Sequence, residues 1–138
     1  MKIEVINGVN LNMLGQREKA IYGEKTLDQI NSEIKAHCDK KGVEVCFYQS
    51  NIEGAICERI QQSDADAIVL NAGAYTHYSI AIRDAITSAR KRVVEVHLSN
   101  LFAREEFRQK SMIAPVCIGT VCGFGYKGYL IAIESLII

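Results

Sequence analysis

Short apolar runs alternate along the chain with longer stretches in which apolar residues recur at helical spacing. The runs are bounded by polar residues or glycine, a pattern typical of buried β-strands covered on both faces. We therefore predict five strands, at residues 2–7, 43–48, 67–70, 93–97 and 117–122.

The stretches between these runs predict helices. Thr26 and Gln29 form a capping box, after which apolar residues recur on one face until Gly42 ends the helix. Further helices are predicted from about residue 53, at 79–90, at 103–111 and at 129–136. Residues 8–25 are polar and contain glycine, and we expect them to form a lid or binding loop without secondary structure.

The alternation places residues 1–138 in one α/β domain, since no linker rich in proline or serine divides the chain. We expect a flavodoxin-like three-layer sandwich with a five-stranded parallel sheet in the order 2-1-3-4-5. In such sheets ligands bind beyond the carboxyl ends of the strands, where the strand order reverses. The loops that begin at Asn7, Asn71 and His97 should therefore share one cleft.

The charge is balanced, with 16 basic and 16 acidic residues. Without a basic cluster, neither nucleic acid nor an anionic membrane is an expected partner. No apolar run approaches the ~20 residues that span a bilayer. The first residues have the pattern of a strand rather than a signal peptide, so we expect a cytoplasmic protein.

No cofactor is expected from the sequence. The five cysteines are scattered without a CxxC pair or a histidine at ligand spacing, which argues against a metal site and favours reduced, structural thiols. The segment Gly123–Gly128 matches GxGxxG, but only ten residues follow it. That is too few for the second strand and the acidic residue of a dinucleotide site.

Three loops hold side chains suited to catalysis. The first contains Arg17 and Tyr22, and the second, residues 71–79, is dense in hydrogen-bonding groups. In the third, His97 ends a buried strand, and Glu95 lies on the same strand face because side chains alternate with period two. A carboxylate beside an imidazole fixes its tautomer. Each loop also has a purely structural interpretation. The first is then a plain surface loop, the second consists of ordinary turn residues, and His97 is a core histidine whose hydrogen bonds are satisfied.

Two further groups of charged residues are ambiguous. Arg104 and Arg108 stand four residues apart with Glu105 and Glu106 between them. We expect one arginine to pair with a glutamate and the other to face the cleft. His37 lies among charged residues, and we expect it on a solvated helix face.

Six segments of the chain form a characteristic set: NGVNLN (7–12), Arg17 to Tyr22-Gly23, QSNIEG (49–54), NAGAYTH (71–77), EVHLSN (95–100) and AREEFR (103–108). Taken together, they resemble the type II 3-dehydroquinate dehydratase family nearly from end to end. Val9 and Ala72 stand where that family usually has proline, Ile52 where it has histidine, and Tyr78 where threonine is common.

The resemblance implies a hydro-lyase that dehydrates 3-dehydroquinate to 3-dehydroshikimate through an enolate, without metal, cofactor or Schiff-base lysine. This reaction belongs to the shikimate pathway, which leads to chorismate and the aromatic amino acids. By the same resemblance Tyr22 is the base, activated by Arg17, and His97 is the general acid. A guanidinium at ~4 Å would favour the phenolate by about 4 kcal/mol at an effective dielectric of ~20.

The resemblance also implies how the substrate is bound. The backbone N–H groups of Leu98 and Ser99 would hold its carboxylate, and Asn71, His77 and Arg108 would contact its ring substituents and carboxyl group. Asp84 would reach the cleft of a neighbouring subunit in a homo-oligomer, a dodecamer built from four trimers.

The C-terminal residues 130–138 are apolar on nearly every side. We expect a helix here to leave an exposed apolar patch for subunit contact.

Two other functions agree less well with the sequence. A flavin- or nucleotide-binding module would need a phosphate-binding loop after the first strand, and residues 7–15 contain no serine or threonine. An inactive relative with an assembly role is disfavoured because Arg17, Tyr22, His97 and Arg108 are all present. Biosynthesis and quinate breakdown stay open as roles.

Overall fold

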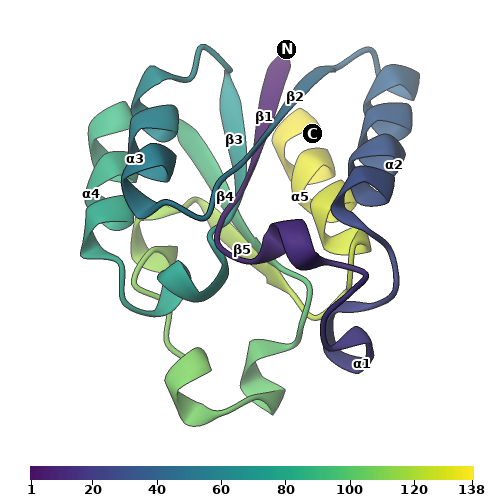
Figure 1. Ribbon diagram of the computed structural model, residues 1–138. Coiled ribbons are helices and arrows are strands. Elements are labelled where there is room, and N and C mark those ends of the chain that lie inside the picture. The colour runs from purple at the N-terminus through teal and green to yellow at the C-terminus, as the bar shows by residue number, and fades with distance from the viewer.

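The computed structural model describes all 138 residues, and one parallel sheet lies at its centre (Figure 1). The expected strand order is confirmed: β2-β1-β3-β4-β5. The chain therefore reverses its winding direction between β1 and β3, and the carboxyl ends of these strands meet at one edge of the sheet. The strands are β1 (Lys2–Asn7), β2 (Glu44–Gln49), β3 (Ala67–Asn71), β4 (Arg92–His97) and β5 (Gly119–Cys122).

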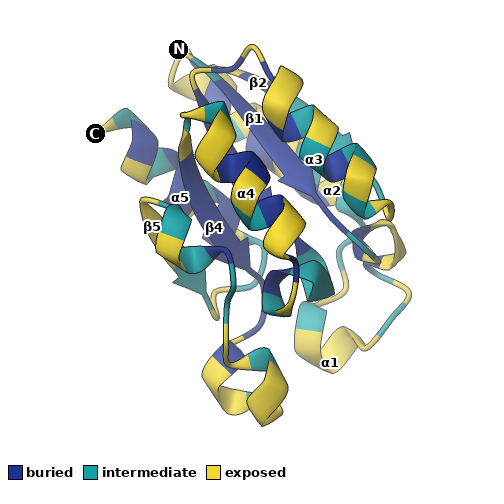
Figure 2. Cartoon of the chain, turned by 90° about the vertical axis from the view of Figure 1, so that its left-hand side faces the viewer, coloured by how far each residue is buried: buried dark blue, intermediate teal, exposed yellow.

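Four helices cover the two faces of the sheet (Figure 1). Helices α2 (Leu27–Lys40) and α5 (Lys127–Ile137) pack on one face around a core of 18 buried residues. Helices α3 (Glu53–Gln62) and α4 (Ile80–Ala89) pack on the other around 11. Figure 2 shows the consequence: β1 and β4 are buried along nearly their whole length, whereas α3 and α4 in front of them are buried along one stripe only.

The predicted helix starts are confirmed at two places. Thr26 Oγ1 accepts from Gln29 N–H at 3.2 Å, and Gln29 Oε1 accepts from Thr26 N–H at 2.9 Å, which completes the capping box. Ser79 Oγ accepts from Ile82 N–H at 3.0 Å and caps α4. These caps satisfy N–H groups that have no partner within the helix.

The helix predicted at residues 103–111 was wrong. Two 3-10 turns stand there instead, η3 (Leu101–Ala103) and η4 (Glu106–Arg108). Asn100 caps the first turn by accepting from Phe102 N–H, and the backbone of Arg104 is extended, with φ −106° and ψ −176°. The extended residue separates the turns, so no continuous helix forms.

The last strand and helix also differ from expectation. β5 begins at Gly119 because Pro115 lies in the 3-10 turn η5 (Ala114–Val116), while α5 begins two residues before the predicted start. The predicted apolar patch on residues 130–138 was not found. Most apolar residues of α5 are buried or packed against the core, and the exposed large apolar side chains are Ile131 and, just beyond the helix, Ile138.

The expectation for His37 also needs correction. His37 does not lie on a solvated face, because its Nε2 lies 2.8 Å from Glu134 Oε1 and joins α2 to α5. Of the five cysteines, all free, only Cys38 is fully buried. The other four are partly exposed.

The stretch after β1 contains secondary structure, contrary to expectation. It forms a 3-10 turn, η1 (Leu11–Met13), and a one-turn helix, α1 (Lys19–Tyr22). Left-handed backbone at Glu18 (φ 32°) and Gly23 (φ 85°) bounds α1. The residues of α1 are not buried, so the segment from Arg17 to Lys25, called the lid below, lies on the surface beside the sheet edge.

None of the helices combines the length and the apolar character that crossing a bilayer would require.

Candidate active site

The loops after β1, β3 and β4 meet at the carboxyl edge of the sheet, as the topology predicts. They enclose a cavity of about 100 Å³. A larger open hollow of about 1030 Å³ lies beside it and shares four lining residues: Tyr22, Leu98, Ser99 and Arg104. Eight of the predicted site residues line the smaller cavity: Arg17, Tyr22, Asn71, His77, His97, Leu98, Ser99 and Arg108.

Tyr22 lies between two arginines. Arg17, from the lid, places its guanidinium carbon 4.5 Å from the centre of the tyrosine ring and an Nη2 atom 3.4 Å from the hydroxyl oxygen. Arg104, from the loop after η3, donates a shorter hydrogen bond to the same oxygen, at 2.8 Å. The phenol oxygen of Tyr22 therefore accepts hydrogen bonds from two guanidinium groups.

His97 is held by a buried carboxylate. Its Nε2 lies 2.9 Å from Glu95 Oε1, and both side chains are almost fully buried. Ser111 Oγ donates to Glu95 Oε1 at 2.6 Å, and Thr120 Oγ1 donates to Glu95 Oε2 at 2.8 Å. Each carboxylate oxygen of Glu95 is therefore hydrogen-bonded, and the imidazole is fixed with Nδ1 as its remaining nitrogen.

These contacts keep Glu95 ionised. Burial alone would raise the pKa of Glu95, but the hydrogen bonds from His97, Ser111 and Thr120 and the nearby imidazole outweigh it, so the pKa is lowered. The carboxylate lies 2.9 Å from Nε2 of His97, so this nitrogen carries a proton and the orientation of the ring is fixed.

The second histidine of the cleft is oriented by a backbone carbonyl group. His77 Nδ1 lies 2.8 Å from the carbonyl oxygen of Lys110, and its ring is nearly parallel to that of His97, with centroids 6.4 Å apart. A carbonyl can only accept, so Nδ1 carries a proton, and in the neutral ring Nε2 is the acceptor. Burial lowers the pKa of His77, which favours this neutral form.

The loop after β4 offers two free backbone donors. The N–H groups of Leu98 and Ser99 bond to no other backbone group, although both residues are buried and line the cavity. The glycine-rich turn after β5 holds this loop: Gly125 N–H donates to Leu98 O at 3.0 Å and Gly123 N–H to His97 O at 3.4 Å. Both glycines have positive φ, so the GxGxxG segment serves as a support for the active-site loop.

The two remaining predicted contacts are less enclosed. Arg108 lines the cavity, while its Nε donates to Glu105 at 2.6 Å. Arg104 is thus the arginine that faces Tyr22, and Arg108 the one that pairs with a glutamate. Asp84 is exposed on α4 and does not line the cavity of its own chain.

Sequence reasoning missed four residues of this site. Arg104 was left undecided, although it makes the shorter hydrogen bond to Tyr22. Ser111 and Thr120, which bond Glu95, and Tyr129, which bonds Asn71 at 2.9 Å, were not singled out. Only Thr120 had a usable signal, since it lies on the strand next to Glu95.

No three His, Cys, Asp or Glu side chains are grouped so that they could hold a metal ion. The site instead combines a phenol between two cations, a carboxylate–imidazole pair and free backbone N–H groups. A flavodoxin-like sheet with this set at its carboxyl edge is typical of an enzyme that acts on a small molecule.

Comparison with known proteins narrows the class. The sequence model of the family described as "Dehydroquinase class II" matches residues 1–137. A 3-dehydroquinate dehydratase of Nitratiruptor sp. is 55% identical, over 99% of this chain and 88% of that protein. One of Clostridium acetobutylicum is also 55% identical, over 99% and 96%.

Solved structures agree. The type II dehydroquinase of Butyrivibrio crossotus superposes with a TM-score of 0.97 at 51% identity, covering 100% of this chain and 98% of that one. That of Propionibacterium acnes gives a TM-score of 0.94 at 39% identity, covering 98% and 94%. The chain therefore belongs to the class II dehydroquinase family.

Proposed function

We propose that this enzyme removes water from 3-dehydroquinate to give 3-dehydroshikimate, a step of the shikimate pathway towards chorismate and the aromatic amino acids. The observation that carries the proposal is Tyr22. Its hydroxyl accepts from Arg17 and Arg104 in a cavity that also holds the His97–Glu95 pair. A base and an acid within one cleft are what an elimination next to a ketone requires.

Tyr22 is the base in this proposal. As phenolate it takes the proton from the carbon next to the ketone, and the electron pair moves into an enolate. Each guanidinium at ~4 Å contributes about 4 kcal/mol in favour of a negative oxygen at an effective dielectric of ~20. The 2.8 Å bond from Arg104 supports a role for this arginine beside Arg17.

His97 is the general acid. The enolate collapses to the conjugated enone as the carbon–oxygen bond of the leaving hydroxyl breaks, and that hydroxyl takes a proton from His97 to leave as water. With Nε2 bonded to Glu95, the proton comes from Nδ1. The ionised Glu95 stabilises the imidazolium before transfer and holds the ring in place.

The free N–H groups of Leu98 and Ser99 support binding of the substrate carboxylate, because two adjacent backbone donors suit an anion. Asn71, His77 and Arg108 supply polar groups for the ring hydroxyls and the carboxyl group. His77 presents an acceptor nitrogen, and Arg108 keeps N–H groups beyond its bond to Glu105.

The test is a direct assay with 3-dehydroquinate, following the ultraviolet absorbance of the conjugated enone. Wild-type protein should form product in the presence of a chelator and after treatment with borohydride and substrate. Tyr22→Phe should lower kcat at least about 10²-fold, the minimum expected of a positioned base, while substrate still binds. A variant that keeps more than about a tenth of wild-type kcat would overturn the assignment of Tyr22.

We also propose a cytoplasmic homo-oligomer, a dodecamer of four trimers, in which Asp84 completes the cleft of a neighbour. The exposure of Asp84 on α4, away from the cavity of its own chain, supports a role in trans. Light scattering of the active protein, combined with Asp84→Asn kinetics, tests this. A fully active monomer would refute the shared site.

A further inference from the structure

One tyrosine hydroxyl is buried directly beneath the cleft. Tyr129, in the first turn of α5, has no exposed surface. Its oxygen accepts from Asn71 Nδ2 at 2.9 Å, and its proton goes to Asn7 Oδ1. Asn7 and Asn71 are paired residues at the carboxyl ends of β1 and β3. The three side chains therefore form one chain of hydrogen bonds from Asn71 through Tyr129 to Asn7.

A hydroxyl carries a single proton, and this fixes the direction of the chain. Because the proton of Tyr129 is committed to Asn7, Asn71 must donate to Tyr129. Burial raises the pKa of Tyr129 well above its usual range, so the phenol keeps this proton. The side-chain amide of Asn71 therefore always meets an acceptor, the oxygen of Tyr129, on the side that faces this tyrosine.

The other side of the Asn71 amide meets a donor. Gly73 N–H donates to Asn71 Oδ1 at 3.1 Å. Gly73 is itself fixed, with φ 65° and its Cα so close to Val9 that an added Cβ would lie 2.6 Å from the Val9 carbonyl oxygen. If the Asn71 amide were turned over, its NH₂ group would face the N–H of Gly73, donor against donor. Its carbonyl oxygen would then face the oxygen of Tyr129. Both contacts thus favour one orientation.

We propose that Tyr129 is a positioning residue for substrate binding: it locks the Asn71 carboxamide so that the second N–H of Nδ2 is presented to the cleft as a donor. Of the three linked residues, only Asn71 lines the cavity, so the effect of Tyr129 reaches the ligand through this amide. The inference rests on the proposed function, with a ring oxygen of the substrate as acceptor. Phenylalanine would keep the packing of Tyr129 and remove only the hydroxyl.

Kinetics of Tyr129→Phe test this. Under the proposed function, Asn71 contacts a ring oxygen equally in the bound substrate and in the transition state, so loss of this contact should raise KM with little change in kcat. We expect KM to rise about tenfold, as for one hydrogen bond, and kcat to stay within about twofold. Lost folded protein would instead lower apparent kcat at unchanged KM. The matched control is Tyr48→Phe, a partly buried tyrosine of β2 outside the cavity, which should leave both constants unchanged.

A double-mutant cycle with Asn71→Ala separates positioning from general packing. If Tyr129 acts through Asn71, adding Tyr129→Phe to Asn71→Ala should change KM less than twofold. An equal tenfold effect in both backgrounds, or no effect in the single variant, would overturn the proposal.

A readout independent of turnover is the side-chain amide resonance of Asn71, assigned by its loss in Asn71→Ala. This resonance should shift in Tyr129→Phe and not in Tyr48→Phe. An unshifted resonance in Tyr129→Phe would refute the lock, that is, the fixing of the Asn71 carboxamide by Tyr129. This holds even if the wild-type protein does not convert 3-dehydroquinate. Wild-type inactivity with the expected shift would refute the proposed function and retain the lock.

Discussion

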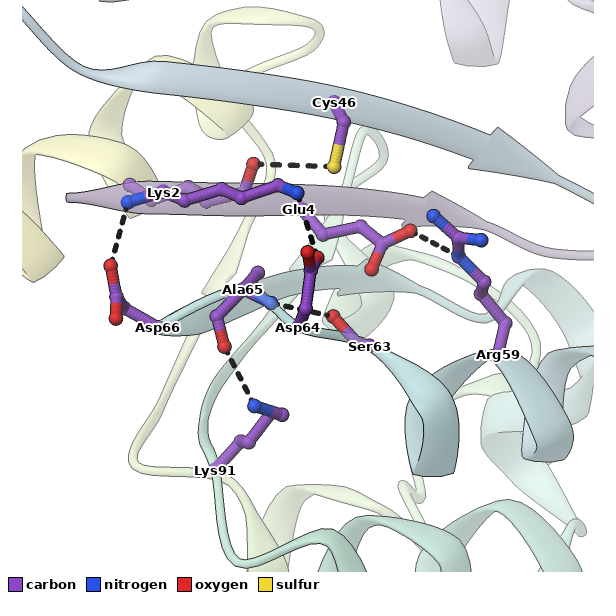
Figure 3. Close-up of polar contacts among 10 residues, drawn as sticks. Lys2, Glu4, Cys46, Arg59, Ser63, Asp64, Ala65, Asp66 and Lys91 are labelled. Atoms are coloured by element: carbon purple, nitrogen blue, oxygen red, sulfur yellow. Dashed lines mark hydrogen bonds and ion pairs between the residues drawn. The ribbon is translucent and has the colours of Figure 1, made fainter.

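Two glutamates are completely buried in the sheet, and their surroundings differ. Glu4 of β1 and Glu95 of β4 each have no exposed surface, and both side chains lie on the face covered by α3 and α4. Glu4 is paired with Arg59 of α3, and its second oxygen, Oε2, has no hydrogen-bond partner (Figure 3). Glu95 has every oxygen bonded, to His97, Ser111 and Thr120.

The partners explain what each carboxylate can do. Arg59 carries a permanent charge, and its side chain is 39% exposed, so Glu4 links β1 to a helix at the protein surface. The partner of Glu95 is a titratable imidazole at the last position of β4. Glu95 pairs with Leu70 and Glu4 with Ile68, so Glu95 lies two positions nearer the edge that carries the cleft. The two buried carboxylates thus differ in their partner and in their place along the strand, and under the proposed function only Glu95 supports a residue of the cleft.

The largest effect is expected for Glu95→Gln. The amide keeps the shape of the side chain but cannot stabilise the imidazolium of His97, so kcat with 3-dehydroquinate should fall about 10²-fold. The matched change Glu4→Gln should leave kcat within about twofold. If both variants lost activity equally, the distinction between the two glutamates would fail.

The second effect concerns stability and is expected at the other glutamate. Arg59→Gln leaves the carboxylate of Glu4 buried without a cation. Breaking a fully buried pair costs about 3–5 kcal/mol; because Arg59 is partly exposed, we expect the free energy of unfolding to fall by about 2 kcal/mol, measured in urea. Lys35→Gln removes an exposed helical pair with Asp39 and should cost less than about 0.5 kcal/mol. Equal losses in the two variants would show that the Glu4 pair gains nothing from burial.

A smaller effect is expected for Thr120→Val, which keeps the volume of the side chain and removes the donor to Glu95 Oε2. One lost hydrogen bond to a buried carboxylate should lower kcat several-fold, through weaker support of His97. Thr87→Val is the control, since the Thr87 hydroxyl bonds only the Arg83 carbonyl on an exposed helix surface. An unchanged kcat in Thr120→Val would mean that His97 and Ser111 alone hold the carboxylate.

The sequence predicted the sheet order and most of the polar residues that line the cavity, because period and position along strands carry that information. His97 and Glu95 share a face by alternation alone, and Asn71 and Arg17 follow strands that meet at the switch point. The fold of residues 101–116 was not predictable in the same way. Its 3-10 turns depend on the cap of Asn100 and on Pro115, and residues 103–111 carry helical spacing that the structure does not use.

The supporting contacts were beyond sequence reasoning for a different reason. Ser111 meets Glu95 across 16 positions, Arg104 meets Tyr22 across 82, and Tyr129 meets Asn7 across 122. No local period links such pairs, so only the folded chain reveals them. The prediction of an exposed apolar patch on α5 was wrong for a similar reason. The helix was expected to expose the apolar side that does not face the sheet, but β4, β5 and α2 pack around it and bury most of that surface.

The smallest effect is the contribution of Glu95 to stability in acid. Its pKa in the folded protein is lowered, so the unfolded chain binds the proton more readily. The stability from this group is therefore complete above its ordinary pKa of about 4.5 and is lost as the pH falls below it. In urea unfolding between about pH 5 and about pH 3, stability should fall most steeply for the wild type and least steeply for Glu95→Gln, which has no proton to bind. Thr120→Val should be intermediate, because removing one hydroxyl donor leaves burial less opposed and brings the pKa of Glu95 closer to its ordinary value. Identical slopes in all three proteins would mean that the hydrogen bonds around Glu95 do not outweigh its burial, and the contrast with Glu4 would then rest on His97 alone.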